Sequence, residues 1–283
     1  MSFKSLFLST LVLLSISANA QTDADKQTTR SNTQTYEDVP NVDIDSVSAV
    51  LEIPDNVSAG SNGTGLAYDP VKKLYYSAFA GNSTFPFIVF KSNGKVLDDK
   101  NTTMIDVRGL WYNPKTAAIE ANGYAEYGIV QYQLDKNGVP TSYKTLFEGQ
   151  NQPDANSVGV LDPVHNEILF IEMSDYDGVV HRYSRTTGKE LGIIELKNLD
   201  DLALYNTTTM VYTGIKGAEL GIVDYELAII YLFDVGTGEN TKQVTLPLDA
   251  VVEDRFNFAF ANGMFWFFDT VYRKWYGYRM PKN

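Results

Sequence analysis

The feature that most constrains the fold is a short phrase that recurs along the chain. It consists of an apolar run, a turn that contains Asp or Asn, and a second apolar or aromatic run. Three copies place a proline directly after the turn residue, and two looser copies follow. The turn residues are Asp69, Asn113, Asp162, Asn206 and Asn262. Each copy is typical of a tight antiparallel hairpin, because Pro presets φ and Asp or Asn bonds its own following backbone.

The copies are separated by between 44 and 56 residues. A second turn signal keeps the same period, and each of its dipeptides lies between two strand-like runs. These dipeptides are Asn93-Gly94, Asn137-Gly138, Thr187-Gly188 and Thr237-Gly238. The Asn-Gly pairs suit primed two-residue turns. The unit is therefore strand A, Asp/Asn turn, strand B, loop, strand C, Gly turn and strand D, which predicts an all-β fold of β-propeller type with four-stranded blades.

Five blades are predicted, and the long interval before Asn262 leaves six possible. In the fourth unit we place strand A at residues 202–205 and strand B at residues 210–212. The extra length then falls in a loop, residues 214–226, where we expect partner contacts. The fifth unit lacks its strand D. We predict that an N-terminal strand, residues 48–53, pairs with residues 274–280 and closes the ring, since an open ring would leave two unpaired sheet edges.

The first 20 residues are predicted to be a secretory signal peptide. Lys4 supplies the positive charge, residues 6–16 the apolar core, and Ala18-Asn19-Ala20 a small-residue cleavage site. Residues 21–45 are polar and lack apolar periodicity, so we expect a disordered leader. Residues 46–283 form one propeller domain. No other stretch reaches the roughly 20 apolar residues that a membrane helix needs, so the sequence predicts a soluble protein that is secreted or periplasmic.

The chain is acidic and has no cysteine. Its formal net charge is −12, which opposes binding to nucleic acid and to anionic membranes, because both require neutralisation by Lys or Arg. An exported chain without cysteine depends on its core for stability, as a chain of this length can. We expect a monomer whose partner is a small polar ligand or another protein.

Motifs for catalysis are absent from the sequence. The two histidines, His165 in a hairpin turn and His181 in a strand, are not spaced as a catalytic or metal-binding pair. There is no nucleophile elbow, no paired-histidine zinc motif and no phosphate-binding loop. Two tyrosines in the loop of residues 122–128, Tyr124 and Tyr127, are open to interpretation as loop packing or as exposed rings that stack on a sugar.

The remaining candidate site is the one that the fold creates where the inner strands begin. The position five residues before each Asp/Asn turn is polar in all five units. These residues are Thr64, Arg108, Ser157, Asp201 and Asn257. Their convergence at the mouth of a central channel predicts a site for a polar ligand or a hard cation. Arg108 would pair with a carboxylate of the ligand or of Asp201. The alternative is that these side chains only solvate the strand ends.

The hairpin phrases resemble the β-propeller superfamily that includes SMP-30/gluconolactonase-like, NHL and YVTN proteins. The resemblance covers residues 46–283 and concerns the fold. In the lactonase-like members a calcium-type ion is held by one Glu, two Asn and one Asp. The resemblance implies that Asn156, Asp201 and Asn257 fill three of these places, with a divalent cation such as calcium as cofactor. Glu253 is the nearest candidate for the fourth place.

Two hypotheses follow. The first is an exported, non-catalytic propeller that binds a ligand or partner through its top face and loops, and the absence of a general base and a nucleophile favours it. The second is a metal-dependent hydrolase of lactone or sugar-acid type, in which Asp201 is the base. We favour the first, and the identity of the ligand is not encoded in any motif of the sequence.

Overall fold

A computed structural model describes residues 39–57, 62–81, 85–102, 105–149, 151–171, 178–198, 209–253 and 256–281. All of them belong to one compact unit, Gln34–Asn283. The predicted signal peptide and the predicted leader as far as residue 38 lie outside the described residues. No helix among the described residues is long and apolar enough to cross a membrane.

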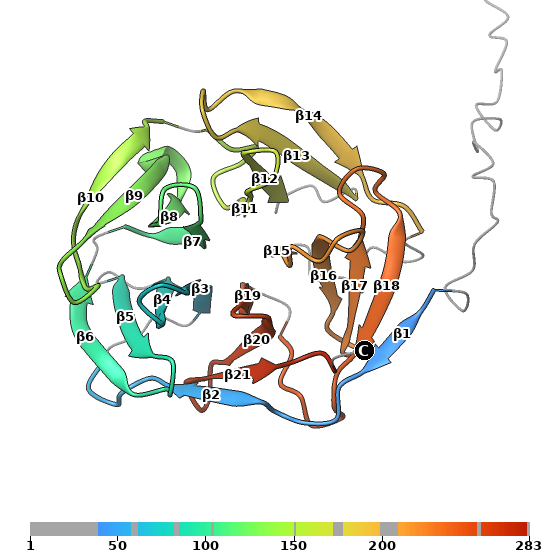
Figure 1. Cartoon of the computed structure of the whole chain (residues 1–283), viewed down its shortest axis with the longest axis horizontal. Helices are drawn as coiled ribbons and strands as arrows, with labels where there is room; N and C mark the ends of the chain where they lie inside the picture. Colours follow the sequence, from blue (N-terminus) through green and yellow to red (C-terminus); the bar gives the residue numbers. More distant parts are fainter. Residues whose placement is uncertain are drawn as a thin grey trace, which may run out of the picture. The chain divides into compact units, whose positions relative to one another are not determined.

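The described strands form five sheets arranged in a ring around a central channel (Figure 1). Blade 1 contains β3 (Asn62–Asp69), β4 (Leu74–Ala80), β5 (Pro86–Lys91) and β6 (Val96–Thr102). Blade 2 contains β7 (Val107–Asn113), β8 (Ala118–Gly123), β9 (Ile129–Leu134) and β10 (Pro140–Phe147), with a short 3-10 helix, η2 (Ala125–Tyr127), between its middle strands. Blade 3 contains β11 (Val158–Asp162), β12 (Glu167–Ile171), β13 (Val179–Ser184) and β14 (Glu190–Glu195).

Blade 4 contains β15 (Val211–Tyr212), β16 (Leu220–Asp224), β17 (Ile229–Phe233) and β18 (Asn240–Thr245). Blade 5 contains β19 (Phe258–Ala261), β20 (Met264–Asp269), β21 (Lys274–Tyr278) and β2 (Ala49–Glu52). Each blade is an antiparallel meander in which the first strand is innermost. The prediction of an all-β propeller with five four-stranded blades is confirmed, as is the resemblance to propellers at the level of fold.

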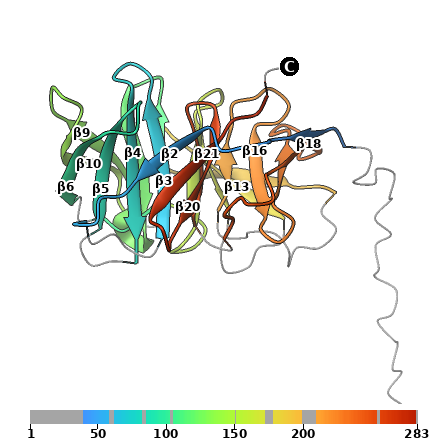
Figure 2. The ribbon, with the colours of Figure 1, turned by 90° about the horizontal axis from the view of Figure 1, so that it is seen from below.

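The ring closes as predicted. Strand β2 pairs antiparallel with β21, and Leu51 lies opposite Trp275. An additional strand, β1 (Asn41–Asp43), pairs in parallel with β18 at the outer edge of blade 4. Residues 41–43, which the sequence analysis assigns to the leader, therefore belong to a sheet of the propeller. Both N-terminal strands run along the outside of the ring, one on blade 4 and one on blade 5 (Figures 1 and 2).

The prediction for the fourth blade is wrong in register. Residues 210–212, predicted as strand B, contain the innermost described strand β15, and the predicted partner loop contains β16, a fully buried strand. The predicted strand A, residues 202–205, lies outside the described residues. The sequence misled because the Asp turn of this blade, at Asp224, joins strands B and C instead of A and B.

The Asp/Asn turns share one geometry in two locations. In blades 1 to 3 they join strands A and B, and in blades 4 and 5 the turns at Asp224 and Asp269 join strands B and C. The predicted turn at Asn262 joins strands A and B of blade 5. The side chains of these turn residues accept bonds from backbone amides two positions on. The five are Asp69, Asn113, Asp162, Asp224 and Asp269. Gly94 and Gly138 have φ of 81° and 86°, whereas Asn93 and Asn137 are not among the positive-φ residues. The predicted primed turns are therefore wrong, and these hairpins need positive φ only at glycine.

The core lies between neighbouring blades, where sheets pack face to face. The cluster between blades 5 and 1 is rich in aromatic rings, among them Trp266, Trp275 and Tyr75. Close to the channel the inner strands of blades 2 and 3 approach so tightly that a Cβ on Gly109 would lie 2.1 Å from the carbonyl oxygen of Gly159. Glycine at this position therefore lets the inner strands surround a narrow channel.

Candidate binding site in the central channel

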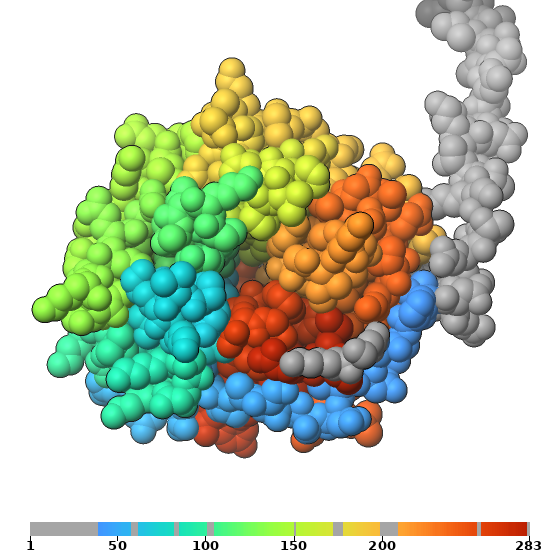
Figure 3. Space-filling view, viewed as in Figure 1, coloured from blue at the N-terminus to red at the C-terminus, as the bar shows by residue number. Residues whose placement is uncertain are grey.

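The five inner strands enclose a cavity of about 330 Å³. It extends along these strands from Thr64 to the A–B turns at Pro114, Pro163 and Asn262. Figure 3 shows the depression at the centre of the ring into which this space opens. No described lining residue carries a charge at neutral pH. The cavity is therefore an uncharged compartment at the centre of an acidic protein.

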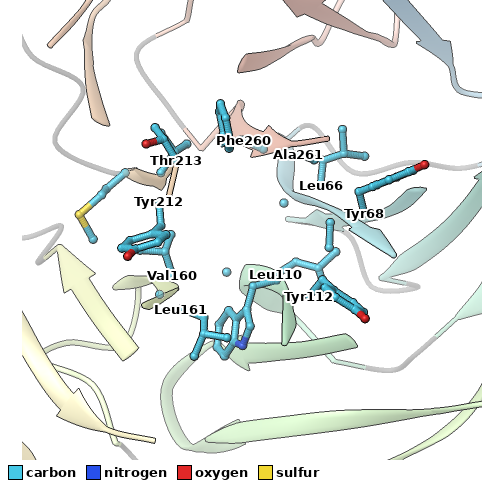
Figure 4. Close-up of a pocket in the computed structure, with 18 of the residues that line it drawn as sticks. Leu66, Tyr68, Leu110, Tyr112, Val160, Leu161, Tyr212, Thr213, Phe260 and Ala261 are labelled. Carbon is cyan, nitrogen blue, oxygen red and sulfur yellow. The ribbon is translucent and has the colours of Figure 1, made fainter. Parts of the chain in front are cut away.

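One half-buried side chain from each inner strand contributes to the lining. The five are Tyr68, Tyr112, Val160, Tyr212 and Phe260. In the close-up of Figure 4, Leu66, Leu110 and Phe260 lie around the opening, whereas the rings of Tyr68 and Tyr112 extend outward from it over the neighbouring blades. Apolar and aromatic walls with a few polar groups are characteristic of small-molecule sites. The described lining of this channel is thus mainly apolar and aromatic.

Tyr212 is tied to the neighbouring blade by a buried acid. Its hydroxyl donates to Asp162 Oδ1 at 3.0 Å. The same carboxylate accepts from the backbone amide of Val164 at 2.8 Å and from Nδ1 of His165 at 2.6 Å. Burial, followed by the negative charge of Asp162, raises the pKa of Tyr212 above its usual value. Burial acts to raise the pKa of Asp162 too, but its hydrogen bonds from His165, Val164 and Tyr212 outweigh burial and hold that pKa below the usual range.

The predicted polar ring is buried between the blades, and of its described members only Thr64 lines the cavity. Thr64 is 2 % exposed, and its Oγ1 has no hydrogen-bond partner among the described residues. Buried hydroxyls are normally satisfied, so an unpaired one beside a cavity is unusual. Thr64 is therefore the described member of the predicted ring whose hydroxyl is not used by another described residue.

Arg108 serves the protein itself. Its Nη1 and Nη2 donate to the two carboxylate oxygens of Asp106 at 2.5 and 3.1 Å, and its Nε donates to Asn156 Oδ1 at 3.2 Å. The guanidinium also lies 4.8 Å from the ring centre of Tyr124 and 5.4 Å from that of Phe256. These contacts hold Arg108 in place where β7 begins. They differ from the predicted pairing with Asp201, which lies outside the described residues.

Two other members of the ring bind backbone. Ser157 Oγ accepts from the amide of Asp154 at 3.1 Å. Asn257 Oδ1 accepts from the amide of Gly63 at 2.9 Å, which joins blade 5 to blade 1. In blade 4 the buried polar residue just before the inner strand is Thr209, two positions from β15. Asp201, which the sequence analysis predicts for this place, lies outside the described residues.

Asn156, Asn257 and Glu253 do not fit the calcium-type ion that the fold resemblance implies. Asn156 Oδ1 already accepts from a guanidinium, and Asn257 Oδ1 already accepts from a backbone amide. Glu253 accepts from Asn257 Nδ2 at 3.0 Å and from Thr270 Oγ1 at 3.0 Å. Within the described ranges no group of three or more His, Cys, Asp or Glu side chains is placed to hold a metal. A cation beside Arg108 would also meet its positive charge.

The tyrosines of the channel are the residues that the sequence analysis missed. Tyr68 and Tyr112 immediately precede the Asp/Asn turn in units 1 and 2, at the end of the apolar run of the repeated phrase. Their spacing from the turn was visible, but a strand residue next to a turn faces either the channel or the blade, depending on the register of the hairpin. Tyr124 and Tyr127, by contrast, are exposed. Exposed rings are what the sugar-stacking interpretation of this loop requires.

The chain matches no protein-family model, and comparison with curated proteins finds no significant match. Solved structures with the same fold exist in number, with 508 matching chains. One is the crystal structure of Myxococcus xanthus glutaminyl cyclase, which has a TM-score of 0.54 and 8% identity, and the match covers 86% of this chain and 98% of that chain. At this identity the similarity establishes a common fold and carries no residue of the site with it.

Proposed function

We propose that this protein is an exported binding module that holds a small uncharged ligand in its central channel. The observation that carries the proposal is a cavity of about 330 Å³ whose described lining is apolar, aromatic or hydroxyl-bearing and includes the unpartnered Thr64 Oγ1. The volume lies within the range of about 300–1,000 Å³ that is usual for small-molecule sites.

The lining specifies the chemistry of the ligand. Leu110, Val160 and Phe260 offer an apolar surface, and removing an apolar ligand from water contributes to binding in proportion to the area buried. A charged ligand would lose its hydration without gaining a countercharge. A ligand with an aromatic or aliphatic body and one hydroxyl or carbonyl that reaches Thr64 suits this channel best. This proposal differs from the expectation of a small polar ligand drawn from the sequence.

Hydrolysis of a lactone or sugar acid remains the second candidate. Its base, Asp201, lies outside the described residues, and the described asparagines of its metal set already accept hydrogen bonds from the protein. No observation in the described part of the chain favours this reaction, so we derive no step for it. The structural neighbour is a glutaminyl cyclase, and we treat cyclisation of N-terminal glutamine as an activity to assay rather than as an assignment.

The proposal is tested by the melting temperature of the purified protein in the presence of uncharged probes. Toluene, benzyl alcohol and p-cresol should each raise it, because a ligand that binds only the native state stabilises that state. Benzoate and benzylamine, which have the same ring and a charge, should have no effect. Val160→Trp, which fills the channel, should abolish the shift for every probe.

Thr64→Val is the matched variant for the polar contact. It keeps the shape of the side chain and removes the hydroxyl, so it should weaken benzyl alcohol and leave toluene unchanged. Equal shifts for charged and uncharged probes, or a shift that survives Val160→Trp, would contradict binding in the channel. Turnover of a lactone or of an N-terminal glutamine that is lost in Asp201→Asn would replace the binding proposal by an enzymatic one.

A further inference from the structure

The hairpins that join strand A to strand B lie together at one end of the ring. The inner strands begin side by side, as where Asn257 Oδ1 accepts from the amide of Gly63 at 2.9 Å, so they also end side by side. The surface formed by these hairpins is called the turn face here. It comprises residues 70–73, 114–117, 163–166, 213–219 and 262–263. Because Pro114 and Asn262 line the cavity, the turn face surrounds one end of the channel.

The exposed side chains of the turn face that carry a charge at neutral pH are all lysines. The four are Lys72, Lys73, Lys115 and Lys216. The acids beside these turns are withdrawn from solvent, since Asp69 is 1 % exposed and Asp162 is 0 % exposed. Glu219 is half-buried, and its two oxygens accept from the amides of Gly217 and Val235. The turn face is therefore a cationic surface on an acidic protein.

The opposite end of the blades carries charge of the other sign. In the described B–C turns, residues 124–128, 225–228 and 270–273, the exposed charged side chains are Glu126 and Glu226. Strand B separates the two ends, and the seven residues of β4 span about 23 Å at the usual rise. Exposed charges are largely screened beyond about 8 Å at physiological ionic strength. An anionic surface at the turn face therefore interacts with the lysines and is screened from the acids of the other end.

Most of the positive charge of the turn face is not neutralised by the protein. Lys72 pairs with the buried Asp69 at 3.1 Å. The other three lysines form no ion pair with a described residue, and they are Lys73, Lys115 and Lys216. In blade 5 the exposed Arg279 lies beside the A–B turn, because a Cβ on Gly263 would be 3.2 Å from its Nη1. These four cations come from four different blades, so the charge is distributed around the channel.

Two aliphatic side chains accompany the lysines on the turn face. Val71 and Val164 follow the proline in the A–B turns of blades 1 and 3, and they are 76 % and 73 % exposed. Lysines mixed with exposed apolar side chains are typical of protein segments that lie on a membrane surface. A surface that bound only a charged polymer would need the lysines and not the valines. The composition of the turn face therefore favours a lipid surface.

We propose that the turn face docks on an anionic lipid surface. Its lysines contact the lipid phosphates, Val71 and Val164 enter the interfacial layer, and the adjoining end of the channel faces the lipid. The sequence analysis expects the net charge of −12 to oppose binding to anionic membranes. The proposal differs from that expectation because the charge is divided between the two ends of the ring. Docking does not depend on which ligand the channel holds.

Co-sedimentation of the purified protein with vesicles tests the proposal. Vesicles of equimolar phosphatidylglycerol and phosphatidylcholine should bind the protein, and vesicles of phosphatidylcholine alone should not. Binding should weaken as the salt concentration is raised, because salt screens the lysines. Absence of binding to the anionic vesicles at low ionic strength would overturn the proposal.

The triple variant Lys73→Gln/Lys115→Gln/Lys216→Gln tests the cations. Each lysine near an anionic membrane contributes about fivefold to affinity, so the triple variant should bind the anionic vesicles about a hundredfold more weakly. These side chains are exposed and unpaired within the described chain, so the variant should fold. Vesicle binding equal to that of the wild type would contradict docking through the turn face.

The matched control is Lys100→Gln/Lys144→Gln/Lys242→Gln. It removes the same charge from the outermost strands β6, β10 and β18, which belong to the same three blades. The control should bind the anionic vesicles nearly as well as the wild type. Equal losses in the two triple variants would mean that net charge, and not the turn face, controls binding.

Val71→Ser/Val164→Ser distinguishes a lipid surface from a soluble polyanion. It should weaken vesicle binding and leave binding to dextran sulfate unchanged. Vesicle binding that is unaffected by this variant, or binding to dextran sulfate without binding to vesicles, would contradict the lipid partner. The toluene-induced rise in melting temperature should persist in the triple lysine variant of the turn face, so failure of docking and failure of the channel proposal are separate results.

Discussion

The interface between blades 2 and 3 and the interface between blades 5 and 1 solve the same packing problem with different chemistry. Between blades 2 and 3 the fully buried Glu120 accepts from Arg185 Nη2 at 2.6 Å and Nε at 2.9 Å, and from Trp111 Nε1 at 3.1 Å. Between blades 5 and 1 the rings of Phe79 and Phe268 lie 5.3 Å apart. One interface depends on directional polar bonds and the other on aromatic area.

This difference predicts how each interface responds to substitution of its side chains. Apolar packing loses stability in proportion to the atoms removed. A buried ion pair behaves differently, because removing one partner leaves the other charged and desolvated. Blade 5, on one side of this interface, is also the sheet in which the N-terminal strand β2 pairs with β21. The aromatic interface therefore secures ring closure, and the polar one fixes how two adjacent blades are oriented.

The largest effect should come from removing the closing strand. Deleting residues 46–54 takes β2 from the edge of blade 5 and removes the buried Leu51 and Ile53 from the aromatic interface. The melting temperature should fall by about 10 °C or more, because each kcal/mol is worth about 2–4 °C at this size. Differential scanning calorimetry is the measurement, and an unchanged transition would show that closure adds nothing to stability.

Next in size is Glu120→Ala. It should cost about 3–5 kcal/mol, because Arg185 would be left buried without its countercharge. The double variant Glu120→Leu/Arg185→Met should recover most of this loss, since a buried pair can be replaced by apolar side chains of similar volume. Urea unfolding measures both. A double variant as unstable as the single one would mean that the other donors to Glu120, and not its charge pair, dominate the interface.

Trp275→Ala tests the aromatic side of the comparison. Trp275 is fully buried, and its Nε1 donates to Ser77 Oγ of blade 1 at 2.9 Å. The loss should be about 3–5 kcal/mol and should arise from the cavity that is created. Trp275→Phe keeps most of the area and loses the hydrogen bond, so it should cost much less. Equal losses in the two variants would assign the interface to its polar bond.

A smaller, pH-dependent effect is expected between blades 3 and 4, where the buried carboxylate of Asp162 accepts a hydrogen bond from Tyr212 of the next blade. Its pKa is lowered in the folded protein, so the folded state prefers the ionised form and the stability it contributes is present above the usual value near 3.8. That stability is lost as the pH falls through the lower folded-state pKa. Asp162→Asn should be less stable at neutral pH and should lose less stability on acidification. Urea unfolding at several pH values checks this, with exposed Asp45→Asn as control.

The smallest effect has the opposite sign. Thr64→Val should stabilise the protein without ligand by about 1 kcal/mol, because it removes a buried hydroxyl that lacks a partner. Ser157→Ala is the contrasting variant, since Ser157 Oγ accepts a backbone bond and its loss should destabilise. If both variants destabilise equally, then the Thr64 hydroxyl has a hydrogen-bond partner in solution.

The number of blades and the closing strand could be predicted because turn residues recur with one period and the final unit lacks a strand. The fourth blade could not, because an Asp turn has the same local chemistry whether it joins strands A and B, as at Asp69, or B and C, as at Asp224. Local turn chemistry fixes a hairpin but not its place in the sheet.

The hydrogen-bond partners of the candidate site residues could not be predicted, for a related reason. Polar residues do lie where the inner strands begin, but the side chains of Arg108 and Asn257 already form hydrogen bonds between blades. Only the three-dimensional partners decide whether a polar side chain is free, and those partners are distant in sequence. Asn257 and Gly63, for example, are 194 residues apart. The sequence carries no signal for such a pairing.

The pairing of β2 with β21 also determines when the ring can close during synthesis of the chain. Strand β2 is made before the other strands of the five blades and its partner β21 after them, so the ring stays open until the intervening strands have been synthesised, at about 5–20 residues per second. Contacts so far apart in sequence are formed late and slowly. For a chain that we propose to be exported, this delay has a use. Such a polypeptide cannot complete its fold before β21 has emerged. It would therefore remain able to pass through a membrane channel while its N-terminal part is already crossing.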